Sequence, residues 1–209
     1  MKIVLYTDLD GTLLDLYNYS CEVALPALAT LKRRKIPVVF CTAKTLAENE
    51  YYREELGIRD PFIVENGGAI FIPQGYFSFV FHYTKEMKHY YVIEFGARYE
   101  ELRAALNAIR AETGFKIKGF GDMAAKEVAQ ITGLGLEEAR LAKLRDFDEP
   151  FLFEGDEEPL LKAIKEMGLN CICTKEGFYH LMGKNDKGKA VEILTRLYKK
   201  EFSHIVTIA

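Results

Sequence analysis

Short apolar runs alternate along the first part of the chain with stretches whose apolar residues recur at helical spacing. Runs at 2–7, 36–41 and 61–64 consist mainly of apolar residues, and their lengths suit strands that are buried on both faces of a sheet. Between the first two runs, one helix face is formed by Ala24, Ala27, Leu28 and Leu31. This order of elements predicts a parallel sheet with right-handed crossovers.

The pattern changes after about residue 81. An aromatic-rich segment leads into an expected strand near 90–95, and the next helix has an apolar face made by Leu102, Leu106 and Ile109. Short strands and helices follow to about residue 182. The last helix, before the apolar run "HIVTIA", is expected to bury Ala190, Ile193, Leu194 and Leu197. We therefore expect an α/β fold in which residues 82–182 form a second domain, inserted into a core made of 1–81 and 183–209.

Composition places the chain among ordinary soluble globular proteins. Its 209 residues are 49% hydrophobic and 28% charged, with a net charge of −3, which predicts no nucleic-acid partner. The one basic run, residues 32–35, falls at a helix end, where cations complement the helix dipole. No apolar run approaches the ~18 residues of a membrane span, and Asp8 interrupts the N-terminal run too early for a signal peptide. We expect a cytoplasmic monomer or homodimer that does not bind membranes, with four reduced, buried cysteines.

Two acids stand at the end of the first strand, in "VLYTDLDGTLLD". Ligands of parallel sheets bind beyond the carboxyl ends of the strands, where Asp8 and Thr42 both fall. Asp8 and Asp10 are two residues apart, so both side chains can face the same opening. Gly11 allows a sharp turn, and Thr12 offers a hydroxyl and a backbone N–H to an anion. One carboxylate could attack while the other transfers protons, with a divalent cation screening their repulsion.

Two other interpretations of these acids need no such chemistry. For an isolated Asp-x-Asp-Gly, a strand that ends in an Asx-type turn is the favoured interpretation. A calcium loop that starts at Asp8 would need glycine at its sixth position and an acid at its twelfth, and Leu13 and Tyr19 stand there instead. The calcium interpretation is therefore excluded.

Three segments resemble the motifs of the haloacid dehalogenase superfamily. Asp8-Leu9-Asp10-Gly11-Thr12 resembles the first motif, in which the first aspartate is the nucleophile and the second the acid/base. "VVFCTAK" resembles the second, which places Thr42 on the phosphoryl group, and "GKNDKGKA" the third, which places Lys187 there. The resemblance implies a phosphatase with a Rossmann-like parallel-sheet core and an inserted α/β cap domain. It also implies Mg²⁺, held by Asp8 and Asp10.

A closer resemblance extends over nearly the whole chain. "CTAKTLAENEYYREELGI", "PFIVENGGAIFIP", "RDFDEPF" and "FYHLMGKNDKGKA" are similar to the mannosyl-3-phosphoglycerate phosphatases. Membership would imply hydrolysis of mannosyl-3-phosphoglycerate to mannosylglycerate, a compatible solute. Another sugar phosphate, such as the glucosyl analogue, remains an alternative, as does an inactive phosphate- or sugar-binding homologue.

The substrate contacts are a separate expectation. Glu65, Asn66 and Gly67 follow a strand and are expected to line the site, although a plain turn is nearly as good an interpretation. Lys44 would meet the phosphate or the glycerate unless it faces solvent. From the inserted domain, Arg145 suits a carboxylate and His180 suits sugar hydroxyls. Their alternatives are a surface ion pair and a satisfied histidine at a strand end.

The lysine-rich segment has one rival interpretation. Residues 183–189 match the first seven positions of a P-loop, but Ala190 stands where a Ser or Thr must bind magnesium. A nucleotide-binding protein is therefore disfavoured. In the superfamily, a fourth motif of one or two acids follows the strand after the Lys187 helix. "SHIVTIA" resembles that strand, so we expect roughly 40–60 further residues to complete the fold.

Overall fold

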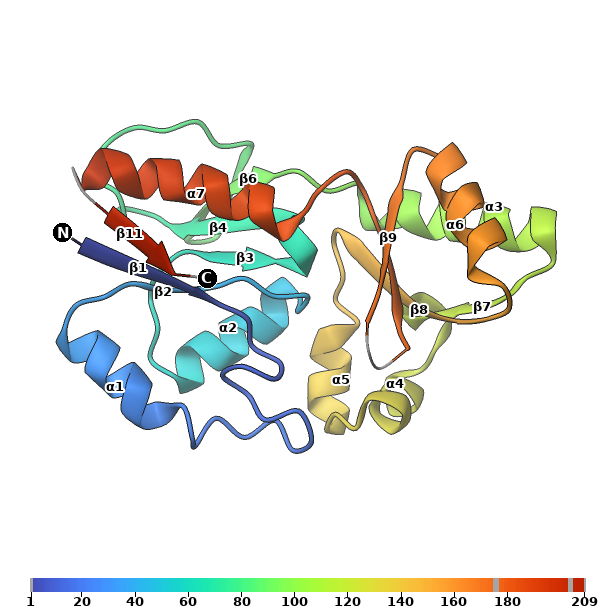
Figure 1. Ribbon diagram of the computed structural model, residues 1–209, viewed down its shortest axis with the longest axis horizontal. Helices are drawn as coiled ribbons and strands as arrows, with labels where there is room; N and C mark the ends of the chain where they lie inside the picture. Colours follow the sequence, from blue (N-terminus) through green and yellow to red (C-terminus); the bar gives the residue numbers. More distant parts are fainter. Residues whose placement is uncertain (1, 175–176, 203–204, 209) are drawn as a thin grey trace. The chain divides into compact units, whose positions relative to one another are not determined.

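The computed structural model describes residues 2–174, 177–202 and 205–208 and divides the chain into two compact units (Figure 1). The first unit comprises Met1–Glu94 and Asp186–Ala209, and the second comprises Phe95–Asn185. From the sequence, residues 82–94 are expected in the inserted segment. They lie in the first unit because β6 (Tyr90–Glu94) pairs along its whole length with β4 (Ala69–Pro73).

A parallel sheet forms one half of the first unit. Its strand order is β11 (Ile205–Ile208), β1 (Lys2–Thr7) and β2 (Val38–Phe40). The crossover from β1 to β2 contains α1 (Leu25–Arg33), whose last turn holds two cations of the basic run, as predicted. Of the expected strand "HIVTIA", residues 204 and 209 lie outside the described part of the chain. The predicted parallel pairing with its helical crossover is therefore confirmed for β1 and β2, whereas the third predicted strand, within 61–64, belongs to a different sheet.

The second sheet of this unit is antiparallel, in the order β3 (Phe62–Val64), β4, β6 and β5 (Lys85–Met87). Before β3 comes α2 (Leu46–Glu55), and α7 (Lys187–Glu201) precedes β11. A single parallel bridge, Cys41 to Ile63, joins β2 to β3. The sequence did not predict that β4, β5 and β6 extend the first unit in this way.

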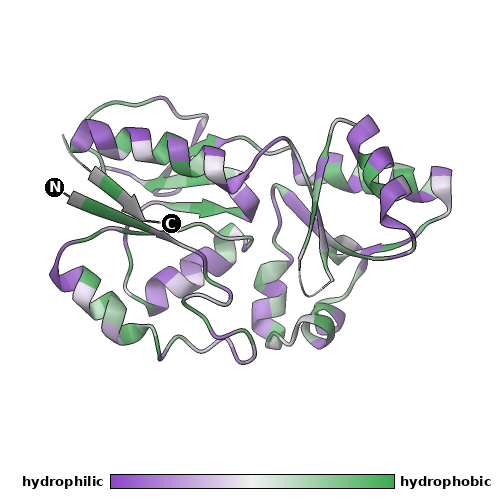
Figure 2. Cartoon of the chain, viewed as in Figure 1, coloured by the Kyte–Doolittle hydropathy of each residue, from purple (hydrophilic) through white to green (hydrophobic). Residues whose placement is uncertain are grey.

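Burial follows the sequence pattern for β2 and β3, which are buried at every residue, whereas Ile3 and Leu5 of β1 are only partly buried. Apolar residues concentrate on β3 and β4 in Figure 2. The buried Tyr198 hydroxyl belongs to a chain of hydrogen bonds. It lies 2.9 Å from the Tyr76 hydroxyl, which donates to Asp60 Oδ1 at 2.7 Å. Because Tyr198 is fully buried, this hydrogen-bonded chain satisfies a hydroxyl that would otherwise be costly to desolvate.

The second unit is built on an antiparallel sheet in the order β7 (Lys116–Gly119), β8 (Asp148–Glu154), β10 (Tyr179–Met182) and β9 (Asn170–Cys173). Helices α3 (Tyr99–Thr113) and α6 (Glu157–Glu166) share one apolar cluster with this sheet. A smaller cluster joins the short helix η2 (Phe120–Asp122) to α4 (Ala125–Thr132) and α5 (Leu136–Ala142). The Asp122 carboxylate fixes η2, because Arg103, Arg110 and the Gly119 amide all donate to it.

The cysteines depart from the prediction. All four are free thiols, as expected, but only Cys41 is buried, and Cys173 is exposed. The prediction was wrong for Cys173 because β9 is an edge strand of its sheet. Among the described residues, no helix has the length and apolar character needed to cross a membrane.

Candidate active site

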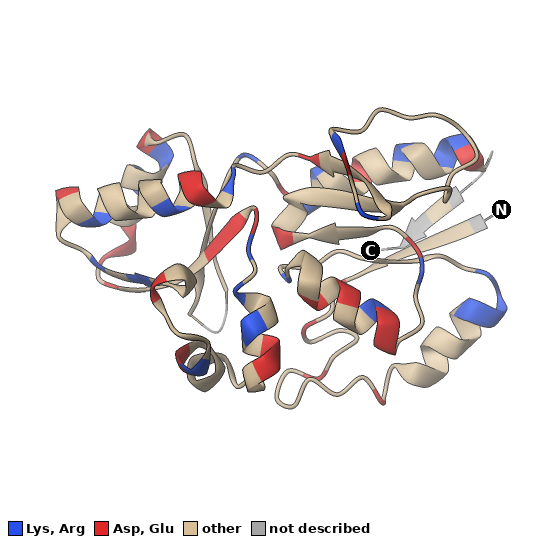
Figure 3. Ribbon diagram, turned by 180° about the vertical axis from the view of Figure 1, so that it is seen from behind, with Lys and Arg blue, Asp and Glu red and all other residues tan. Residues whose placement is uncertain are grey.

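Three strand ends of the first unit carry the candidate residues, and backbone hydrogen bonds hold these ends together. The Thr42 amide, beyond β2, donates to the carbonyl of Ile63 in β3 at 3.2 Å. The Asn66 amide, beyond β3, donates in return to the Thr42 carbonyl at 3.0 Å, and the Glu65 amide to that of Lys44 at 3.1 Å. Strands β2, β3 and β4 carry no Lys, Arg, Asp or Glu, so charge lies in the loops and helices around them (Figure 3).

Lys187 and Asp8 meet although 179 positions separate them in the sequence. Asp8 follows β1 directly, and Lys187 is the first residue of α7. The Lys187 Nζ atom donates to Asp8 Oδ2 at 2.5 Å, while Asp8 Oδ1 accepts from the Leu9 amide at 2.8 Å. Asp186 caps α7 by accepting from the Lys189 amide at 2.7 Å. Both charged side chains remain more than a third exposed, at 35% for Lys187 and 39% for Asp8, which leaves them accessible to a ligand.

The close approach of α7 depends on the loop after β3, the short helix η1 (Glu65–Gly67). Its three residues all have positive φ, 45°, 56° and 86° in sequence order. A Cβ atom on Gly67 would lie 2.3 Å from the Asp186 carbonyl oxygen and 2.9 Å from the Lys187 nitrogen. Glycine is therefore required there on two counts, since it tolerates this φ and leaves room for the helix that carries Lys187. Gly67 therefore determines how closely the backbone of Asp186 and Lys187 can approach η1, and so where Lys187 lies.

The turn after Asp8 is tight. Gly11 has φ +69°, as the sequence predicts for this position, and its amide donates to the Leu14 carbonyl at 2.9 Å. The Thr12 amide donates to the Leu9 carbonyl at 3.1 Å. The Thr12 N–H, which the sequence suggests as an anion-binding group, is therefore already hydrogen-bonded within the turn. The exposed Thr12 side chain is a separate group that this hydrogen bond does not occupy.

A second ion pair involves the other aspartate. Lys44 Nζ lies 3.1 Å from Asp10 Oδ1 and 3.4 Å from Glu48 Oε1. Burial raises the pKa of Asp10 above its ordinary value, with the Lys44 ammonium acting against that rise. Burial alone would lower the pKa of Lys44, but the Glu48 and Asp10 carboxylates raise it. Glu48 was not a candidate in the sequence analysis, although "TLAE" is a capping-box pattern that marks a fixed glutamate at the start of a helix.

The donor set at the end of β1 suits a hard cation. Asp8 presents a partly exposed carboxylate, with 39% of its side-chain surface exposed, and Asp10, two residues further along, would offer its backbone carbonyl oxygen. Mg²⁺ commonly takes one or two carboxylates and keeps several waters. The part of the chain that the structure describes contains no group of three or more His, Cys, Asp or Glu residues placed to hold a metal. These two aspartates therefore fit Mg²⁺ as a hydrated ion with few protein ligands.

The remaining two candidates belong to the second unit. His180, on β10, is 7% exposed, and its Nδ1 atom lies 2.8 Å from Asp148 Oδ1 of β8. The contact fixes the ring, since Asp148 is fully buried. Arg145 donates from Nε to the Ala142 carbonyl at 2.8 Å, and its guanidinium lies 6.0 Å from the centre of the Phe120 ring. No spacing in the sequence indicates the Asp148–His180 pair, because 32 positions separate the two residues and only the strand register joins them.

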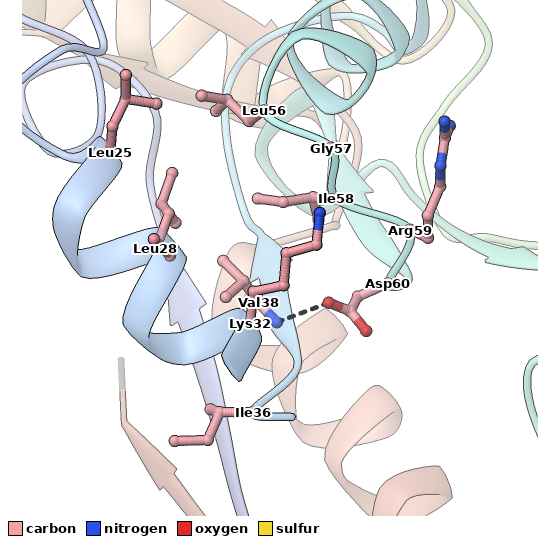
Figure 4. Close-up of a pocket in the computed structure, with 11 residues that line it drawn as sticks. Leu25, Leu28, Lys32, Ile36, Val38, Leu56, Gly57, Ile58, Arg59 and Asp60 are labelled. Atoms are coloured by element: carbon pink, nitrogen blue, oxygen red, sulfur yellow. Dashed lines mark hydrogen bonds between the residues drawn. The ribbon is translucent and has the colours of Figure 1, made fainter. Parts of the chain in front are cut away.

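Figure 4 shows a cavity in the first unit that contains none of the candidate residues. Its volume is about 500 Å³, and most of its lining residues, apolar and charged, come from α1 and from the segment that follows α2. The Val38 amide at the start of β2 donates to Asp60 Oδ2 at 2.9 Å, the bond drawn in the figure. The cavity therefore lies at the amino-terminal edge of the parallel strands, opposite the edge that carries Asp8 and Thr42.

Relatives that are named as phosphatases align with nearly the whole chain. A glucosyl-3-phosphoglycerate/mannosyl-3-phosphoglycerate phosphatase of Methanococcoides burtonii is 51% identical over 213 aligned positions, covering 100% of this chain and 78% of that protein. A mannosyl-3-phosphoglycerate phosphatase of Pyrococcus furiosus is 41% identical over 201 positions, covering 94% and 78%.

Solved structures share the fold at low sequence identity. A protein from Thermoplasma acidophilum superposes with a TM-score of 0.68 at 18% identity, covering 100% of this chain and 76% of that one. A sugar phosphatase of haloacid dehalogenase subclass IIB superposes with a TM-score of 0.64 at 15% identity, covering 99% and 80%. The model of one family, described as haloacid dehalogenase-like hydrolase, matches residues 5–208. With acids beyond β1, a hydroxyl beyond β2 and a lysine opening α7, this chain belongs to the haloacid dehalogenase-like hydrolases.

Proposed function

We propose that this protein is a Mg²⁺-dependent phosphatase that hydrolyses mannosyl-3-phosphoglycerate to mannosylglycerate and phosphate. The observation that carries the proposal is the 2.5 Å contact between Asp8 and Lys187, with Asp10 two residues further along. It joins a carboxylate nucleophile to a cation that suits a phosphoryl group. The names of the relatives from M. burtonii and P. furiosus supply the substrate class.

The reaction follows from the roles of the two acids. Asp8 attacks phosphorus in line, so that a bond forms to its carboxylate oxygen while the bond from phosphorus to oxygen 3 of the glycerate breaks. Asp10 gives its proton to that departing oxygen, and afterwards takes one from the water that hydrolyses the aspartyl phosphate. Lys187 and Thr42 bind the phosphoryl oxygens. Mg²⁺, held by the Asp8 carboxylate and the Asp10 backbone carbonyl, would supply positive charge that screens the repulsion between the nucleophile and the phosphate.

The second unit is proposed to select the leaving group. His180 is oriented through Nδ1 by a buried carboxylate, which favours the use of its other ring nitrogen for a sugar hydroxyl. Arg145 suits the glycerate carboxylate. Equal losses of turnover on a small generic phosphate ester and on mannosyl-3-phosphoglycerate, in His180→Ala or Arg145→Ala, would contradict this role.

The direct test compares the wild type with Asp8→Asn on mannosyl-3-phosphoglycerate, with magnesium and with a chelator. Because the nucleophile forms the covalent intermediate, its loss should abolish turnover, and chelation should lower the turnover of the wild type. Undiminished turnover by Asp8→Asn would refute the mechanism. Binding of substrate without any turnover by the wild type would favour an inactive binding homologue.

A second candidate substrate is glucosyl-3-phosphoglycerate, because the name of the M. burtonii relative includes both sugars. The two substrates differ in the orientation of one hydroxyl, and a site that hydrogen-bonds that hydroxyl discriminates between them. The ratio of kcat/KM for the two substrates decides which one the protein prefers.

A further inference from the structure

Lys44 is a charged side chain that is enclosed on several sides. It is 5% exposed, and its ammonium lies 3.1 Å from Asp10 Oδ1 and 3.4 Å from Glu48 Oε1. The rings of Tyr19 and Tyr52 lie beside it, with their centres 5.2 Å and 5.5 Å from Nζ. Two carboxylates and two aromatic rings therefore surround the ammonium, an arrangement that leaves little of it for a ligand.

Glu48 holds this lysine to a rigid element. Its Oε2 atom accepts from the Thr45 amide at 2.9 Å, and its own amide donates to Thr45 Oγ1 at 3.1 Å. This reciprocal capping box fixes the first turn of α2. With Glu48 itself only 3% exposed, the carboxylate that faces Lys44 is anchored at both oxygens.

Asp10 has a different environment. Its side chain is 38% exposed, but the Oδ1 atom is buried and faces the Lys44 ammonium at 3.1 Å. The ion pair with Lys44 is thus the contact that fixes Oδ1, and it leaves the other carboxylate oxygen on the accessible side. A carboxyl group that transfers protons must be held within hydrogen-bond reach of the reacting oxygen.

We propose that Lys44, anchored by Glu48, is a positioning residue that orients Asp10 for proton transfer to the leaving group. This role replaces the contact with phosphate or glycerate that the sequence suggests for Lys44. The inference rests on the proposed function, because it takes Asp10 to be the general acid.

A comparison of two leaving groups distinguishes a positioning role of Lys44 from a purely structural one. Loss of a positioning residue affects the ester that needs a proton more than the ester that does not, whereas a structural defect affects both. p-Nitrophenyl phosphate and phenyl phosphate have similar shapes and carry neither a sugar nor a carboxylate. Nitrophenolate is a weak base that departs without a proton, whereas phenolate, with a conjugate acid of pKa about 10 as in tyrosine, benefits from one. The measured quantity is kcat/KM, which reports the steps up to the transfer of the phosphoryl group to Asp8.

We expect Asp10→Asn to lower kcat/KM on phenyl phosphate much more than on p-nitrophenyl phosphate, within the range of about 10²–10⁴ that general acids contribute. Lys44→Met should show the same selectivity with a smaller loss, about 10- to 100-fold on phenyl phosphate, near the cost of a 1 Å misplacement. Lys44→Arg, which keeps the charge, should recover part of it. The matched control is Lys199→Met, which removes the same charge from an exposed position of α7.

A second variant guards against misfolding, since Lys44→Met leaves the Glu48 carboxylate buried without its cation. The double variant Lys44→Met with Glu48→Gln removes both charges and keeps a residue that can complete the capping box. It should retain the wild-type circular dichroism and the same selective loss on phenyl phosphate.

One outcome would overturn this inference alone: kcat/KM falls equally on both esters in the folded Lys44→Met and double variants, while Asp10→Asn shows a selective loss. Lys44 would then be assigned to phosphate binding. No selectivity in Asp10→Asn would overturn the general-acid role and this inference with it. A wild type that hydrolyses neither these esters nor mannosyl-3-phosphoglycerate would refute the proposed function itself.

Discussion

Replacing Gly67 by alanine should damage the active site without touching a catalytic side chain. The added Cβ atom would lie 2.3 Å from the Asp186 carbonyl oxygen, whereas ordinary contacts begin at 3.4 Å, so one of the two backbones must move by about 1.1 Å. The positive φ of 86° adds a strain of roughly 1–2 kcal/mol for an L side chain. Because Lys187 follows Asp186 directly, the movement shifts the ammonium that contacts Asp8. A misplacement of about 1 Å can cost on the order of 10²-fold in rate.

The matched control is Gly75→Ala. Gly75 has a similar φ of 75° but nothing within 4 Å of the added atom, so this variant carries the strain without the clash. We expect both variants to lose stability in urea unfolding, and Gly67→Ala alone to lose about 10²-fold in kcat on mannosyl-3-phosphoglycerate. Wild-type turnover by folded Gly67→Ala would refute the idea that this glycine positions Lys187.

Three further predictions concern stability and reactivity. Tyr198→Phe removes a buried hydroxyl that hydrogen-bonds Tyr76 and should lower the free energy of unfolding by about 0.5–1.5 kcal/mol; an unchanged urea midpoint would contradict this. Partial burial acts to raise the pKa of Asp122, but hydrogen bonds from two arginines and a backbone amide bring it well below its usual range. Its contribution is therefore present above the unfolded pKa of about 3.9 and is lost as the pH falls below it, so Asp122→Asn should lose less stability than the wild type between about pH 5 and pH 2.5. Burial raises the pKa of Cys41 to about 12, so at pH 8 a thiol reagent should label exposed Cys173 long before Cys41; equal labelling rates in the native protein would count against this.

The sequence predicted the parallel pairing of β1 with β2 because an apolar strand and its crossover helix leave a local pattern, clear in β2 and α1. Local patterns also identified Asp8, Thr42 and Lys187, because each of these residues lies at the start or just beyond the end of a helix or strand. Contacts set by tertiary geometry left no such pattern. The pairing of β6 with β4, the Asp148–His180 contact and the clearance between Gly67 and Asp186 each join residues whose distance along the chain has no fixed relation to their distance in space.

The residues that hold the two sheets of the first unit together are also those that surround the candidate site. Beyond the bridge from Cys41 to Ile63, which includes the hydrogen bond from the Thr42 amide to the Ile63 carbonyl, the loops after β2 and β3 are joined by the amides of Glu65 and Asn66. A phosphate ester bound between these loops would fasten one sheet to the other, and occupancy would then slow hydrogen exchange at these amides. The parallel and antiparallel halves would open as one cooperative body when the site is filled and more independently when it is empty.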